Sequence, residues 1–181
     1  MSVIGTFDPW ARTFRDDLVP QIVELVLSVW QSLRKPARDE LEPRVTRLLR
    51  HGLLHEKQRR HLPIRIGREE VVDDPSTGEE KGRIDILFMH GWEDDVYFAF
   101  ECKRLNVPAN GSIKTLATEY VEQGMLRFVT GKYAAGLDKG GMIGFVMDGN
   151  STTAMAKVDT EVRKRHRLLL MSPGSGLSVS S

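Results

Sequence analysis

Cysteine is almost absent from this sequence, and so are long apolar runs. The single cysteine, Cys102, excludes an internal disulfide framework and is typical of a protein from a reducing cytoplasm. No apolar run approaches the roughly 20 residues of a membrane span, because Pro20 and Glu24 interrupt the most apolar stretch, residues 18–30. No basic N-terminal segment leads into a continuous apolar one, so the sequence predicts neither a signal peptide nor a membrane partner.

Net charge is also nearly absent, at +1 over 181 residues. A chain of this length is typical of one domain with a buried core, and we predict a single domain over residues 1–171 with a flexible tail at 172–181. Basic residues gather in segments 44–68 and 161–167, which permits a nucleic-acid partner without requiring one. The sequence has no glycine-rich phosphate loop of the nucleotide-binding type, so ATP use is not predicted.

The N-terminal segment predicts an amphipathic helix. Apolar residues recur at helical spacing over residues 10–33, within a helical extension of about residues 8–34. Pro20 is positioned to kink or break this helix. The apolar face is wider than a solvated helix needs, so it either packs on the core or forms a contact in a homodimer or larger complex.

A second helix is predicted to start within residues 36–42 and to end near Glu56. Asp39 and Glu42 have the spacing of a capping box, in which the two ends of a short segment satisfy each other's backbone N–H groups. Pro43 is tolerated only in the first turn of a helix, which fits this start.

The middle of the sequence predicts a meander of three strands. Residues 62–72 suit the first strand, and the turn residues 73–78 connect it to a second strand at 83–89. The polar residues 91–95 then form a hairpin loop to a third strand at 96–105.

Charged residues interrupt this otherwise apolar hairpin. Asp85 lies within the second strand, and Glu101 and Lys103 end the third. A buried strand rarely carries such groups without partners, because an isolated charge in a core is costly. Since side chains alternate along a strand, Glu101 and Lys103 share one face and Cys102 points to the other, into the core. We therefore predict that the three charged residues form a cluster suited to a divalent metal and an activated water.

The C-terminal part predicts further helices and strands. The pattern indicates a loop at 107–112, a helix at 113–133, a central buried strand at 140–147, a helix capped by Asn150 or Ser151 that runs to residue 167, and a last strand at 168–171.

An acid on one strand followed by Glu-x-Lys at the end of the next, in GRIDIL and FAFECKRL before a long helix, resembles the PD-(D/E)XK nuclease superfamily. Ile84 stands where the family name has proline. The resemblance covers residues 41–147 and implies an α/β fold, the restriction-endonuclease-like three-layer core, with a mixed central sheet of about four to five strands flanked by helices. It also implies a metal-dependent nuclease that hydrolyses phosphodiester bonds in DNA, with RNA not excluded, in restriction, phage defence or repair.

The resemblance assigns roles to the charged cluster. Asp85 and Glu101 would bind Mg²⁺ or Mn²⁺, and the backbone carbonyl of Cys102 would complete the shell. Lys103 would orient or deprotonate a water, or stabilise the pentavalent transition state. Glu42 would reach a second metal or hold a water ligand; favouring the helix N-terminus electrostatically is the alternative for this residue.

The helix predicted at 113–133, after Lys103, carries further candidate site residues. Tyr120, Gln123 and Arg127 lie at i, i+3 and i+7. Gln123 matches a glutamine that some branches of the superfamily place beside the lysine, although a surface or packing role fits it equally. Arg127, Tyr120 and Arg104 would contact nucleic acid, with a glutamate partner on the same helix as the alternative for Arg127.

Two other readings of the sequence remain open. His51, His55 and His61 are close in sequence, but a zinc site would need further ligands, so solvated or phosphate-facing histidines are favoured. A catalytically silent module with the same fold could instead bind nucleic acid or a partner protein. The intact set of Asp85, Glu101 and Lys103 favours activity, since a silent copy need not keep all three.

Overall fold

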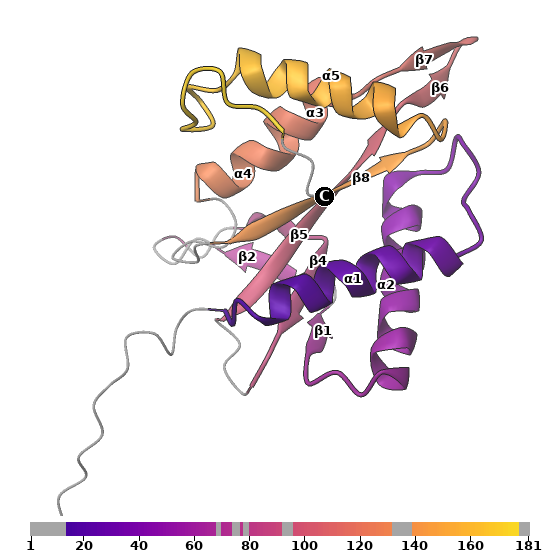
Figure 1. The fold of residues 1–181 in the computed structure, drawn as a ribbon, viewed down its shortest axis with the longest axis vertical. Coiled ribbons are helices and arrows are strands. Elements are labelled where there is room, and N and C mark those ends of the chain that lie inside the picture. The colour runs from indigo at the N-terminus through magenta and orange to yellow at the C-terminus, as the bar shows by residue number, and fades with distance from the viewer. Residues whose placement is uncertain are drawn as a thin grey trace, which may run out of the picture.

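The computed structural model describes residues 14–67, 70–73, 77, 80–91, 96–131 and 139–177. They form a mixed four-stranded sheet with helices on both faces and two separate two-stranded sheets (Figure 1). Among these residues, no helix is long and apolar enough to cross a membrane. In chain order the elements are α1 (Leu18–Ser32), α2 (Glu42–Arg59), β1 (Arg65–Gly67), β2 (Glu70–Asp73), β3 (Glu80–Ile84), β4 (Ile86–Met89), β5 (Tyr97–Leu105), β6 (Val107–Ala109), β7 (Ser112–Lys114), α3 (Ala117–Tyr120), the π-helix η2 (Val121–Met125), α4 (Leu126–Val129), β8 (Gly140–Val146) and α5 (Ser151–Lys164).

The main sheet has the strand order β1-β4-β5-β8. The predicted hairpin is confirmed, since β4 and β5 pair antiparallel with Ile86 opposite Phe100. Strand β8 runs parallel to β5. The prediction of a central buried strand there is wrong, because β8 ends the described sheet and is largely half-exposed. Its run without polar alternation arises partly from glycines: a Cβ on Gly141 would lie 2.3 Å from the Phe100 ring, so this glycine makes room for the aromatic side chain.

Strand β5 separates two layers of core. Phe98, Phe100 and Cys102 pack with buried residues of α1 and α2, whereas Leu105 packs with buried residues of α3, η2 and α5. The thiol of Cys102 therefore lies in the core, as predicted. The alternation of a strand then places Glu101 and Lys103 on the opposite face of the sheet.

Helix α1 starts later than predicted, whereas α2 starts at Glu42, within the predicted range. Helix α1 begins at Leu18 rather than near residue 10, and the predicted residues before Phe14 lie outside the described part. Pro20 therefore sits in the first turn, where no N–H partner is needed, and it causes no kink. The predicted capping box of α2 is not formed; Leu41 is the N-cap and makes no side-chain cap. The carboxylate of Glu42 is engaged elsewhere, as described below.

The predicted meander also needs correction. Residues 62–72 form part of two strands in different sheets, since β1 pairs with β4 and β2 pairs with β3. The predicted strand at 83–89 breaks at Asp85, which ends the pairing with β2 and begins the pairing with β5. The turn residues 74–76, 78–79 and 92–95 lie outside the described part.

Four C-terminal predictions are corrected as well. The predicted loop at 107–112 belongs to a β6–β7 hairpin, whose Asn110 and Gly111 have φ of 48° and 77° as a tight two-residue turn requires. The following helical segment consequently starts at Ala117, not residue 113. Helix α5 is capped by Asn150, which accepts from Thr153 N at 3.0 Å, but it ends at Lys164, and residues 168–171 include no strand.

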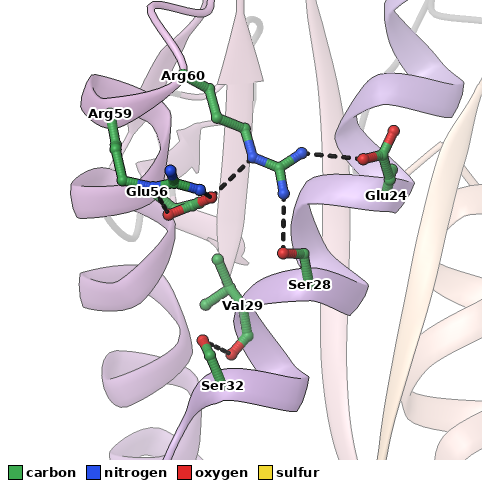
Figure 2. A network of polar contacts seen from close by, with 7 residues as sticks. All are labelled: Glu24, Ser28, Val29, Ser32, Glu56, Arg59 and Arg60. Carbon is green, nitrogen blue, oxygen red and sulfur yellow. Dashed lines mark hydrogen bonds and ion pairs between the residues drawn. The ribbon is translucent and has the colours of Figure 1, made fainter.

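Helices α1 and α2 are joined by a polar network around Arg60, shown in Figure 2. The guanidinium of Arg60 donates to Glu24 Oε1 at 3.0 Å and to Ser28 Oγ at 2.8 Å on α1. It also donates to Glu56 Oε1 at 2.8 Å, and Arg59 donates to the same carboxylate. Glu56 therefore fixes the arginine that connects the two helices.

We expect Glu56→Gln to lower stability at neutral pH and to lower it less as the pH falls. Hydrogen bonds from Arg59 and Arg60 lower the pKa of Glu56 from 4.5 to about 2. A folded-state pKa below the unfolded one stabilises the protein above pH 4.5, and this contribution is lost as the pH falls toward 2. Denaturant unfolding of both proteins between pH 7 and pH 3 measures the difference, which should shrink in acid. A difference independent of pH would contradict this origin.

Candidate active site at the β5 edge

Two carboxylates replace a neighbouring strand along the second half of β5. Strand β4 stops pairing at Phe100, so the next backbone N–H groups on that edge, those of Cys102 and Arg104, have no strand partner there. Cys102 N donates to Asp85 Oδ2 at 2.7 Å, and Arg104 N donates to Glu42 Oε2 at 3.0 Å. Asp85 and Glu42 are thereby held against the strand that carries Glu101 and Lys103.

Lys103 lies at the centre of this group. Its ammonium donates to Glu101 Oε1 at 2.7 Å, to Glu42 Oε1 at 3.2 Å and to the carbonyl oxygen of Cys102 at 3.0 Å. The side chain is 12% exposed, so it is mostly shielded yet reaches the surface. The predicted cluster therefore forms, and Glu42 supplies the helix carboxylate.

Glu101 is the most buried charged group of the site, with a side chain 1% exposed. Its Oε1 accepts from Lys103 and also from Arg127 Nη1 at 2.6 Å. Its Oε2 is buried and has no hydrogen-bond partner among the residues that the structure describes. A buried carboxylate oxygen without a donor is costly, so it calls for a partner such as a cation.

The electrostatics of the site follow from this burial. Burial, and then the charge of Asp85, raise the pKa of Glu101 despite the cations beside it. Burial disfavours the charged form of Lys103, but the hydrogen bond to Glu101 and the nearby carboxylates outweigh it and raise the pKa of Lys103. Burial also raises the pKa of the Cys102 thiol well above its usual value, which argues against a thiolate nucleophile.

A cavity of about 470 Å³ opens over these residues. Gln123 and Arg127 line it, as do Asp85, Glu101, Lys103, Glu42 and Arg104. The sequence analysis missed Arg83 and Glu119, which also line it. Both could have been found by local spacing, since Arg83 lies two residues before the strand acid and Glu119 lies one helical turn before Gln123.

The three residues predicted to contact nucleic acid each contact another part of the protein. Arg127 donates to Glu101, a residue on β5. Arg104 donates from its side chain to the carbonyl oxygen of Glu40 at 2.9 Å. Tyr120 packs on the core between the helices and β8, where burial raises its pKa to about 12. The predicted stripe of Tyr120, Gln123 and Arg127 is divided because the π-helix η2 changes the angular spacing of its residues.

The donor set at the β5 edge suits a hard cation, although it is not a ready-made metal site. In the described part of the chain, no three His, Cys, Asp or Glu side chains are grouped closely enough to hold a metal ion. Asp85 and Glu101 line one cavity, and the carbonyl oxygen of Cys102 accepts a hydrogen bond from Lys103. Glu101 Oε2 accepts no hydrogen bond from the described residues. Carboxylate and carbonyl oxygens are the ligands that Mg²⁺ and Mn²⁺ prefer.

Comparisons with protein-family models, with curated proteins and with solved structures find no match to this chain. Its function therefore has to be argued from the geometry of the β5 edge. That geometry places four acids, a lysine and three arginines around one cavity.

Proposed function

We propose that this chain is a metal-dependent nuclease that hydrolyses phosphodiester bonds in DNA, with the PD-(D/E)XK arrangement and its restriction-endonuclease-like three-layer core. The observation that carries the proposal is the convergence of Asp85, Glu101 and Lys103 at one edge of β5, with Glu101 Oε2 buried and unpartnered. A mixed sheet with helices on both faces supports the fold assignment.

Asp85 and Glu101 would hold Mg²⁺ or Mn²⁺, with the Cys102 carbonyl and Glu42 in support. When bound, such a cation neutralises phosphate charge and lowers the pKa of a water. The protein contributes a rigid frame: Cys102 N fixes Asp85, and Arg104 N fixes Glu42. Because both donors belong to the backbone of β5, the acids keep their positions relative to Glu101 and Lys103.

Lys103 is proposed to act through its positive charge. Its ammonium contacts three oxygens, and its raised pKa keeps it protonated at neutral pH. A protonated lysine stabilises the charge that develops on a phosphate in the transition state, and it cannot take a proton from water. Of the three roles that the resemblance implies, orienting a water and stabilising the transition state are open to a protonated lysine, whereas deprotonating the water is not. Gln123 lines the cavity and can orient a water by hydrogen bonding.

We expect Glu101→Gln to weaken Mn²⁺ binding at least about tenfold, because it removes the charged oxygens of the proposed ligand. Isothermal titration calorimetry measures the affinity without any substrate. Glu119→Gln is the matched control, since it removes a carboxylate from the same cavity but not from the proposed ligand set. Equal affinities of wild type and Glu101→Gln, or an equal loss in the control, would exclude Glu101 as a ligand.

Cleavage of plasmid and linear DNA in Mg²⁺ or Mn²⁺ tests the activity itself. Chelation of the metal should stop the reaction. DNA binding without cleavage under all metal conditions would favour the alternative, a catalytically silent module that binds nucleic acid.

A further inference from the structure

Helix α2 carries several basic residues, and the glutamates beside them already accept hydrogen bonds from other residues. Its sequence contains three arginines, two histidines and no acid over residues 43–55. The glutamates that flank this segment are engaged: Glu42 accepts from Lys103 and Arg104, and Glu56 accepts from the arginines at the C-terminal end of the helix. The segment between them is therefore a region of positive charge.

These basic side chains lie mainly on the face of α2 that points away from the core. Residues three or four apart share a face of a helix, and this spacing joins Arg44, Arg47, His51 and His55, all of which are exposed. Arg50 flanks the row and is half-buried. The row spans about 16 Å along the helix. We call these five residues the α2 basic face.

The arginines of this face are largely available to a ligand. Arg44 pairs with Glu40 at 3.2 Å, but its side chain is 70% exposed, so the pair is weak. Arg47 and Arg50 have no ion-pair partner among the described residues. The guanidinium groups of Arg47 and Arg50 complement the charge of a phosphate backbone.

The face begins at the catalytic cavity. Arg44, at the N-terminal end of the face, pairs with Glu40 at 3.2 Å, and the carbonyl oxygen of Glu40 accepts from Arg104, which lines the cavity. Figure 1 shows α2 along one side of the molecule, with its length directed away from the C-terminal half of β5. A phosphate backbone that follows the face to its N-terminal end would thus reach the cavity on the side of Arg104.

We propose that the α2 basic face binds the phosphate backbone of double-stranded DNA and leads it to the cavity, an inference that rests on the proposed nuclease function. Single-stranded nucleic acid is typically held by aromatic side chains on which bases stack, together with a basic groove. Helix α2 has no Phe, Tyr or Trp. A helix face that carries three arginines and no such side chains suits the sequence-independent contacts that duplex DNA makes through its phosphates.

The test compares two double variants of equal net charge. Arg47→Gln/Arg50→Gln removes two charges from the α2 basic face, and Lys157→Gln/Arg167→Gln removes two exposed charges on or just after α5, on the other side of the sheet. Fluorescence anisotropy of a labelled 20-base-pair duplex in EDTA measures Kd from about 50 to 200 mM salt, a range over which phosphate contacts dominate. We expect the first variant to raise Kd at least about fivefold and to reduce the salt slope by about one unit per lost contact, with the control near wild type.

Several outcomes would overturn the proposal. Equal Kd values and slopes for both variants and wild type, or no duplex binding by wild type, would show that the α2 basic face does not hold DNA. Loss of single-strand binding with duplex binding intact would contradict the choice of ligand. The measurement uses no metal and no turnover, so duplex binding through the α2 basic face in a protein that never cleaves would leave this inference standing while the nuclease proposal fails.

Discussion

Replacing Lys103 with methionine is expected to slow DNA cleavage by about 10²–10³-fold, because it removes the positive charge proposed to stabilise the transition state. Methionine keeps an unbranched apolar stem in place of the lysine stem. Single-turnover cleavage of an end-labelled duplex in Mg²⁺ measures the chemical step, so a change in binding does not mask the result. DNA binding in EDTA should change far less than the rate.

Folding has to be controlled in this experiment. Lys103 neutralises the buried Glu101, and removal of one partner from a buried ion pair is destabilising. Thermal melting by circular dichroism therefore selects a temperature at which the variant is folded. Lys157→Met, an exposed lysine of α5, should cleave at the wild-type rate. A folded Lys103→Met protein with wild-type cleavage would remove Lys103 from the mechanism.

Two replacements of Asp85 are expected to separate its role in stability from its proposed role in metal binding. The asparagine variant retains an oxygen that can accept from Cys102 N, whereas the alanine variant leaves that N–H of a fully buried residue without this acceptor. An unsatisfied buried donor costs about 1–3 kcal/mol. Asp85→Ala should therefore be less stable than Asp85→Asn by about that amount, as measured by denaturant unfolding.

Both Asp85 variants should lose cleavage, because neither supplies the carboxylate charge proposed to hold the metal. Mn²⁺ titration of the folded Asp85→Asn protein should show weakened binding to match. Equal stability of the two variants would contradict the role of Asp85 in covering the β5 edge. Cleavage by Asp85→Asn near the wild-type rate would contradict its role in the site.

Local patterns in the sequence predicted the pairing of β4 with β5 but not where that pairing ends. The alternation of side chains placed Glu101 and Lys103 on one face and Cys102 in the core, and the structure agrees with both. The predicted strand divides at Asp85 into β3 and β4 because β3 pairs with β2 in a separate sheet. The β6–β7 hairpin had a local signal, the Asn110-Gly111 pair typical of a two-residue turn, that the sequence analysis overlooked.

The sequence identified the residues of the site more readily than the contacts between them. Glu42, Glu101 and Lys103 were identified, but the contact between Arg127 and Glu101 joins residues 26 apart across two elements. Likewise, Arg104 N reaches Glu42 only because β4 leaves the edge of β5 open. Such contacts arise from tertiary packing, and no spacing along the chain indicates them.

The most direct test of the account is conversion of supercoiled plasmid by the wild-type protein and Asp85→Asn, each in Mg²⁺ and in EDTA. The account predicts nicked or linear DNA from the wild-type protein in Mg²⁺ alone, and intact plasmid in the other three reactions. Equal cleavage by Asp85→Asn would contradict the assignment of the site. Intact plasmid in every reaction, with the wild-type protein folded and bound to DNA, would contradict nuclease activity.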